Sequence, residues 1–160
     1  ETVWAVNPEH DTLESLVTYI CKFAHDYSRM ANLRCRLEVP LDVPALPVQA
    51  EVRHNVFLVF KEAINNVVKH SGATEVKLGV EIGSEEFSLS LEDNGKGLAS
   101  PPPLDHASPA VAATGGRLIA GRRGNGLGNM RKRIEEIKGR FEMKSEPGKG
   151  TAIRLYVPVK

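Results

Sequence analysis

Two pairs of short alternating segments restrict most strongly what this chain can fold into. The segments cover residues 76–82, 87–93, 140–146 and 151–159. Apolar and polar side chains alternate in each, and the pairs are joined by Gly83–Glu86 and by Pro147–Gly150. Alternation with connections of this length and composition is typical of β-hairpins. We therefore expect an antiparallel sheet with one apolar face, which other elements have to cover.

Three segments with helical spacing can supply that cover. They run from about residue 11 to 30, from about 49 to 70, and from 127 to 138. Asp11 or Thr12 can cap the first helix, and Gly72 is a stop signal after the second. Gly139 ends the third, and residues 34–39 alternate and add one more strand. These elements predict an α/β fold of the two-layer sandwich type, in which helices cover one face of a mixed, mostly antiparallel sheet.

Length, composition and charge limit the classes of protein that remain. The 160 residues suffice for one domain with its own core, and 41% hydrophobic with 26% charged residues is an ordinary globular balance. A net charge of +1 argues against a dedicated nucleic-acid binder, which would carry a basic face. No apolar run reaches the roughly 20 residues that span a bilayer, and the first residues lack the basic, apolar and small-residue pattern of a signal peptide. We therefore expect a cytoplasmic location with no membrane contact by the chain itself. Because the chain begins at Glu1 without methionine, we also expect a fragment of a longer protein.

One long segment has no period of its own. Residues 99–123 contain several prolines, alanines and glycines, but show neither helical spacing nor alternation. A segment of this length without secondary structure inside a compact domain is usually a mobile functional loop. We expect such a loop here.

The second helix carries a polar stripe beside its apolar face. Glu62, Asn66 and Lys69 stand at positions i, i+4 and i+7, and His70 ends the helix next to them. A carboxylate, an amide and an ammonium group on one face can position a nucleophile, supply an oxygen ligand to Mg²⁺ and pair with phosphate. Taken alone, the same stripe is also compatible with a solvated helix face.

Two glycine-rich segments follow at element boundaries. Residues 93–97 (DNGKG) come directly after a strand, where the glycines let the backbone approach a ligand. The carboxylate of Asp93 can accept a hydrogen bond there from the amino group of a base. Residues 124–130 (GNGLGNM) open the third helix, and amides at a helix N-terminus can bind phosphate. A dinucleotide-binding fingerprint would require a βαβ unit before this helix, which the sequence does not contain.

The order and spacing of these motifs resemble one superfamily. The motifs are EAINNVVKHSGA (62–73), DNGKG (93–97), GNGLGNM (124–130) and GKGT (148–151). Together they resemble the GHKL superfamily of ATPases and kinases, and most closely the catalytic domain of bacterial sensor histidine kinases in the branch related to nitrate-type sensors. The resemblance covers about residues 33–160 and implies the histidine kinase ATPase fold.

The resemblance implies that ATP and Mg²⁺ are bound, and it gives the motif residues their roles. Glu62 would be the catalytic residue that orients or deprotonates the attacking group, Asn66 would bind Mg²⁺, and Asn65 would be a second contact to metal or water. Lys69 would contact phosphate, and Asp93 would accept from the adenine amino group. The other ATP-binding residues that the resemblance implies are His70, Gly95, Gly97, Gly124, Gly126, Leu127, Gly128 and Thr151.

The same resemblance divides the chain and predicts its partners. Residues 1–11 would be the junction from upstream dimerisation helices, residues 12–160 the ATP-binding catalytic domain, and about 98–125 its ATP lid. The γ-phosphoryl group of ATP would pass to a histidine on the separate dimerisation domain of the same kinase, because neither His10 nor His25 has the acceptor sequence. A response regulator would be the partner of the full-length protein, which would be a membrane-bound sensor.

Two alternative functions remain open. A serine kinase of the anti-sigma type belongs to the same superfamily, although the junction-like N-terminus argues against it. A non-catalytic ATP-sensing module would bind ATP without transferring phosphate, and it would not need both Glu62 and Asn66. The upstream sequence would decide the first alternative, and an assay of phosphoryl transfer the second.

Overall fold

The predicted strands and helices are all present as elements of the chain. The computed structural model describes the backbone of residues 11–97 and 117–159, and their side chains except those of 117–126. The elements are α2 (Leu13–Met30), β1 (Arg34–Glu38), α3 (Ala50–Asn66), η2 (Val67–Ser71), β2 (Glu75–Ile82), β3 (Glu86–Asp93), α5 (Arg117–Glu136), β4 (Arg140–Glu146) and β5 (Gly150–Pro158). No helix in this part of the chain is long and apolar enough to cross a membrane.

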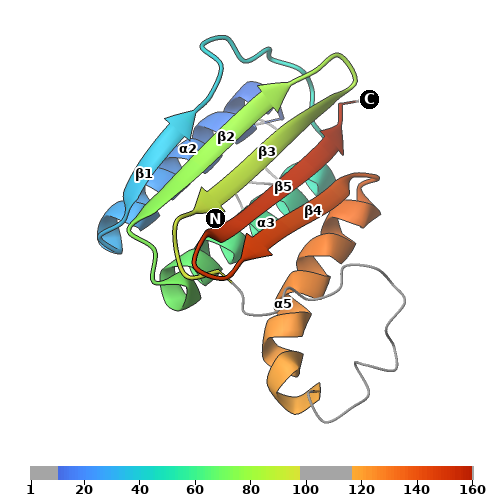
Figure 1. Ribbon diagram of the computed structural model, residues 1–160. Coiled ribbons are helices and arrows are strands. Elements are labelled where there is room, and N and C mark those ends of the chain that lie inside the picture. Colours follow the sequence, from blue (N-terminus) through green and yellow to red (C-terminus); the bar gives the residue numbers. More distant parts are fainter. Residues whose placement is uncertain (1–10, 98–116, 160) are drawn as a thin grey trace.

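Five strands of the described part form one sheet in the order β1-β2-β3-β5-β4 (Figure 1). β1 pairs with β2 in parallel, and every other neighbouring pair is antiparallel. The two predicted hairpins are β2–β3 and β4–β5, and they join where β5 pairs with β3. The predicted mixed, mostly antiparallel sheet is therefore confirmed.

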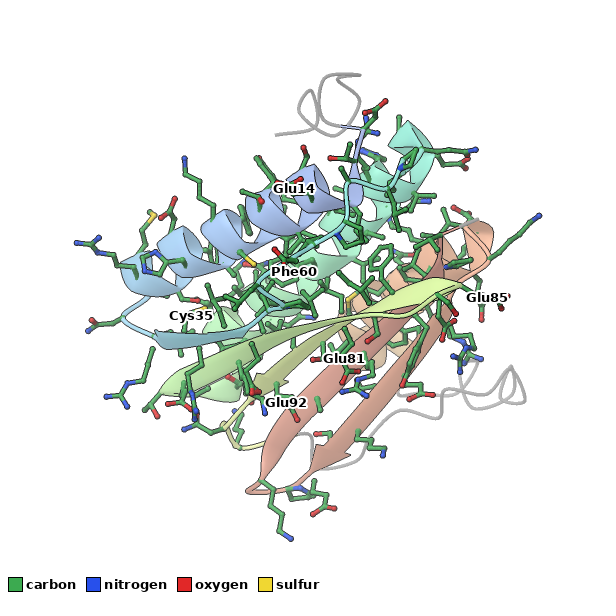
Figure 2. All side chains as sticks on the ribbon, turned by 90° about the horizontal axis from the view of Figure 1, so that it is seen from above. Glu14, Cys35, Phe60, Glu81, Glu85 and Glu92 are labelled. Atoms are coloured by element: carbon green, nitrogen blue, oxygen red, sulfur yellow. The ribbon has the colours of Figure 1, made fainter. Side chains whose placement is uncertain are left out.

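The hydrophobic core lies between the sheet and helices α2 and α3. Figure 2 shows both helices on one side of the sheet, with Phe60 between the two layers. Phe60 and Phe57 are almost fully buried. The rings of Tyr19 and Phe23 contact Phe57 in T-shaped geometry at centroid distances of 5.2 and 5.3 Å. Burial of each such side chain contributes about 1.5–3 kcal/mol, so this core fixes α3 against the sheet.

The opposite face of the sheet is polar. Glu81 and Glu92 lie on the side of the sheet away from the helices (Figure 2). Lys77 forms ion pairs with Glu92 at 2.8 Å and with Glu38 at 3.4 Å. Exposed pairs of this kind contribute at most about 1 kcal/mol each, so the covered face supplies most of the stability.

Helix α2 begins with one of the two predicted caps. The Oγ1 atom of Thr12 accepts the N–H of Ser15 at 3.2 Å, which satisfies one of the free amides of the first turn. The helix ends at Met30, and Asn32 follows with φ of 63°. The predicted bounds of this helix are confirmed.

Two other helix boundaries differ from the prediction. The second predicted helix is α-helical only to Asn66, and its last turn, η2, is a π-helix that ends at Gly72 with φ of 64°. Helix α5 begins at Arg117 and not at residue 127, so Gly124 and Gly126 lie inside it. Periodicity cannot locate this start, because glycine also adopts helical angles at a cost of about 1 kcal/mol per residue.

Candidate functional site

Glu62 and Asn66 lie one turn apart near the end of α3, and both are half-buried. Their α-helical spacing puts them on one side of the helix. Lys69 and His70 follow in η2 and are exposed. Hydrogen bonds in a π-helix run between residues i and i+5, so each residue turns less about the axis than in an α-helix. The regular stripe therefore contains Glu62 and Asn66. The predicted continuation of this stripe to Lys69 is interrupted by the π-helical turn.

Asn65 is tied to the neighbouring helix. Its Oδ1 atom accepts a hydrogen bond from the hydroxyl of Tyr27 on α2 at 2.7 Å. This bond joins α2 to α3 beside the candidate site. One of the two acceptor positions of this oxygen is therefore used between the helices, and the predicted contact of Asn65 to metal or water stays a prediction.

Asp93 ends β3 with its carboxylate held by main-chain amides. Its Oδ1 atom accepts from the N–H of Gly95 at 2.8 Å, and the N–H of Thr151 also donates to the carboxylate. Burial raises the pKa of Asp93 above its usual value, and these two hydrogen bonds oppose that rise. A carboxylate has about four acceptor positions, so this fixed group can still accept from a ligand.

Asn94 attaches the same loop to the start of β2. Its Oδ1 atom accepts from the amides of Thr74 and Glu75, each at 3.0 Å. Its Nδ2 donates to Thr74 Oγ1 at 3.0 Å, and its own amide donates to Glu75 O at 3.2 Å. No role was predicted for Asn94, although an asparagine directly after a strand often bonds nearby main chain.

Two glycines let the loop pack against the turn between β4 and β5. Gly97 has φ of 68°, and a Cβ there would lie 2.2 Å from Glu146 O. Gly150 has φ of 89°, and a Cβ there would lie 1.9 Å from Asp93 O. Both the positive φ and the lack of space exclude a side chain at either position. The GKGT turn is thus in direct main-chain contact with Asp93.

Thr151 contributes to this contact through both its amide and its side chain. Its Oγ1 lies 2.9 Å from Ser145 Oγ, so the two hydroxyls share a hydrogen bond between β5 and β4. Ser145 also donates to Gly150 O at 3.4 Å. Ser145 was not predicted, and only its position opposite Thr151 in the hairpin could have indicated it.

Helix α5 packs along α3 with its second half. Met130 and Ile134 belong to the buried core, and Arg133 Nη1 donates to Asn55 Oδ1 at 3.4 Å. This contact was also not predicted. It joins α5, which contains the glycine-rich segment, to the helix that carries Glu62 and Asn66.

The glycine-rich segment itself does not have the predicted arrangement. Gly124, Gly126 and Gly128 lie within α5, so their amides are not at a helix N-terminus. Leu127 is half-buried and Gly128 is exposed. Residues 98–116, most of the predicted lid, lie outside the described residues.

Three segments far apart in the sequence therefore meet at one edge of the molecule. They are the end of α3 with η2, residues 93–97, and the turn at 148–151. The amide of Lys96 donates to Ser71 O at 2.9 Å, and the amide of Gly148 donates to Lys96 O at 2.6 Å. Figure 1 shows the end of β3 and the start of β5 at this edge, beside the last turn of α3.

A cavity of about 680 Å³ lies at the other end of α3, around Val52 and Arg53, and contains none of the predicted site residues.

A two-layer sandwich in which these motifs meet at a helix end is the arrangement expected of a nucleotide-binding ATPase domain. A family model described as histidine kinase-, DNA gyrase B- and HSP90-like ATPase matches residues 51–160. The chain belongs to this family. The predicted use of ATP agrees with the family's description.

Sensor kinases are among the curated relatives. The sensor histidine kinase LiaS of Bacillus subtilis is 28% identical over 123 residues, which are 77% of this chain and 29% of LiaS. The sensor protein VraS of Staphylococcus saprophyticus is also 28% identical over 123 residues, which are 30% of its length. The chain thus spans less than a third of these relatives.

Solved histidine kinases share the fold. The histidine kinase domain of the blue-light activated kinase from Erythrobacter litoralis EL346 superposes with a TM-score of 0.64 at 16% identity, covering 96% of this chain and 66% of that one. The histidine kinase AdeS of Acinetobacter baumannii gives 0.63 at 19% identity, with 93% and 66% covered. The predicted histidine kinase ATPase fold is confirmed.

Proposed function

We propose that this chain is the ATP-binding catalytic domain of a sensor histidine kinase, which transfers the γ-phosphoryl group of ATP to a histidine on a separate dimerisation domain. The observation that carries the proposal is the meeting of the Asn66 helix, the Asp93 loop and the Gly150–Thr151 turn. The Asn66 helix offers groups to phosphate and metal, and the Asp93 loop offers a hydrogen-bond acceptor to a base. The domain would comprise residues 12–160, with residues 1–11 as the junction to upstream helices.

Asp93 would hold the adenine base. Its carboxylate is fixed by the amides of Gly95 and Thr151, so it is oriented before the ligand arrives. The exocyclic amino group of adenine is a donor that matches the remaining acceptor positions. Gly95 and Gly97 would let the base lie close to the main chain, and the Thr151 hydroxyl would support the same side.

The residues at the end of α3 fit a magnesium ion bound together with phosphates. Mg²⁺ prefers oxygen ligands and is usually held by one or two protein oxygens plus phosphate oxygens and water. Asn66 supplies an amide oxygen, and Lys69 and His70 lie close by in the sequence, exposed for contact with phosphate. When bound, the ion would neutralise charge on the β- and γ-phosphates.

Glu62, one turn before Asn66, would orient the attacking imidazole and accept its proton. Leu127 and the glycines at 124, 126 and 128 would border the phosphates from α5.

The partners of the whole protein follow from the same proposal. The domain would act on the dimerisation domain of its own kinase, and the phosphoryl group would then pass to a response regulator. The domain would lie in the cytoplasm as part of a membrane-bound sensor. It would itself contact neither nucleic acid nor membrane.

The test is phosphoryl transfer between separated domains. The purified chain is mixed with Mg-ATP labelled at the γ-phosphate and with a histidine-bearing dimerisation domain, and the phosphate is then challenged with acid. We expect acid-labile label on the dimerisation domain and none on the chain alone. Acid-stable label on an added protein would favour the serine kinase, and ATP binding without transfer would favour an ATP-sensing module. Label on His10 or His25 of the isolated chain would contradict the absence of an acceptor in this fragment.

A further inference from the structure

A serine side chain closes the last turn of the helix that carries Asn66. Ser71 Oγ donates to Val67 O at 2.5 Å within the π-helical turn η2. The same oxygen accepts from the amide of Ala73 at 3.0 Å. A hydroxyl can donate and accept at once, so Ser71 fixes both the wide turn and the exit of the chain from it. Turns of this type are rare and often occur at functional sites.

The main chain of Ser71 holds the loop that carries Asp93. Its carbonyl accepts from the amide of Lys96 at 2.9 Å. A Cβ at Gly95 would lie 2.4 Å from the same carbonyl oxygen, so the loop backbone lies directly against the turn. One residue thus connects the end of the Asn66 helix to the Asp93 loop.

We propose that Ser71 is a positioning residue that sets the separation between the base acceptor Asp93 and the metal ligand Asn66. This inference rests on the proposed function, because it assumes that one nucleotide contacts both residues. A nucleotide of fixed length can satisfy the two ends of the site together only when their separation matches it. The hydrogen bonds of Ser71 given above go to Val67, Ala73 and Lys96.

Loss of the Ser71 hydroxyl would change the separation between Asp93 and Asn66 without removing either residue. Val67 O and the amide of Ala73 would each lose a partner, and the turn could tighten toward α-helical geometry. The carbonyl of Ser71 would then move away from the amide of Lys96. Asp93 would keep its bonds from Gly95 and Thr151, because neither bond involves Ser71.

The experiment separates base binding from magnesium-assisted phosphate binding. Adenosine, ATP with EDTA and ATP with Mg²⁺ are each titrated into the whole chain, into Ser71→Ala and into Ser88→Ala. Ser88 is a matched control, because it is a buried serine that donates to Glu81 Oε2 at 3.3 Å but lies on the outer face of the sheet. For Ser71→Ala we expect adenosine affinity within about twofold of the wild type. The gain in ATP affinity from Mg²⁺ should be about three- to tenfold smaller, which is of the order of one net hydrogen-bond contribution. Ser88→Ala should behave as the wild type for all three ligands.

The possible outcomes distinguish this inference from the proposed function. If the wild type binds Mg-ATP and Ser71→Ala keeps the full gain from Mg²⁺, Ser71 does not position the site and the inference is overturned alone. Equal weakening of all three ligands would also overturn it, because that result indicates a role in folding only. A wild-type chain that binds no ATP would overturn both proposals. If Ser71→Ala does not fold, Ser71→Cys keeps the size of the side chain with a weaker donor, and an unchanged gain from Mg²⁺ in that variant would overturn the inference.

Discussion

Glu62 and Asn66 stand one turn apart on α3, and their different chemistry predicts different consequences of substitution. Asn66→Ala removes an oxygen ligand, so both magnesium-dependent ATP affinity and transfer should fall. Glu62→Gln keeps the shape and should leave ATP binding close to normal, while transfer to an added dimerisation domain slows by about 10²–10⁴ if Glu62 is the general base. Binding and single-turnover transfer are measured for both variants.

The control for this comparison lies on the same helix. Glu51 is an exposed carboxylate in the first turn of α3, far from the candidate site. Glu51→Gln should transfer phosphate at the wild-type rate. If Glu62→Gln does the same, Glu62 has no catalytic role and belongs to the hydrated surface of the helix.

The raised pKa of Asp93 predicts how stability depends on pH. Burial makes the native state hold this proton more tightly than the unfolded chain does, so stability falls as pH rises from the ordinary value of 3.8 through the raised pKa. Asp93→Asn has no proton to lose at this site. The free energy of unfolding of the wild type should therefore decrease relative to that of Asp93→Asn across this range and stay constant at higher pH. Urea denaturation at a series of pH values measures the difference, and a flat or rising difference contradicts the prediction.

At the scale of elements, two glycines in the β4–β5 turn form a matched pair. Gly148 and Gly150 have φ of 79° and 89°, so alanine is strained at both, by about 1–2 kcal/mol. A Cβ at Gly148 meets nothing within 4 Å, whereas one at Gly150 would lie 1.9 Å from Asp93 O. Gly150→Ala should therefore destabilise the fold by about 1–3 kcal/mol more than Gly148→Ala. Equal free energies of unfolding for the two variants would show that the turn does not pack against Asp93.

Helix α5 gives a test of where that helix begins. Gly128 is exposed within the helix, and a Cβ there meets nothing within 4 Å. Gly128→Ala should therefore stabilise the chain by about 0.5–1 kcal/mol, since alanine favours a helix interior more than glycine does. Gly72→Ala is the contrasting control, because it is equally unhindered but has φ of 64° and should destabilise. Chemical denaturation that shows no gain for Gly128→Ala would contradict a helix-interior position for residue 128, which requires a helix that begins well before residue 127.

The sequence predicts elements better than it predicts their ends and contacts. Alternation and helical spacing predict β2, β3, β4 and β5 to within a residue or so, because each pattern repeats several times. The change to a π-helix after Asn66 is accompanied by the hydrogen bond from Ser71 Oγ to Val67 O, which a periodic pattern does not reveal. Asn94 acts through bonds to Thr74 and Glu75, about 20 residues away, so only the folded chain shows its partners. Residue types indicate the groups that can bind ATP, but not which groups are already used in packing, as Asn65 is.

At the scale of the whole molecule, a nucleotide that contacts three segments should stabilise the fold. At 100 times its dissociation constant, Mg-ATP adds about 2.7 kcal/mol to the free energy of unfolding. For a domain of this size, that raises Tm by roughly 5–10 °C. Differential scanning calorimetry with and without Mg-ATP measures the shift, and Asn66→Ala should show a smaller one. An unchanged Tm for the wild type at saturating Mg-ATP would contradict ATP binding at this site.

The position of β5 in the sheet has a consequence for how the chain folds. β5 is the last strand of the described chain, yet it lies between β3 and β4. Its hairpin with β4 is local and can form early, whereas its pairing with β3 joins Glu92 to Ala152, across most of the second half of the sequence. Contacts between residues so distant along the chain form slowly, because a long loop has to close first. A nascent chain therefore cannot bring Thr151 to Asp93 until β5 has been synthesised, so the candidate site can assemble only after all five strands described here have left the ribosome.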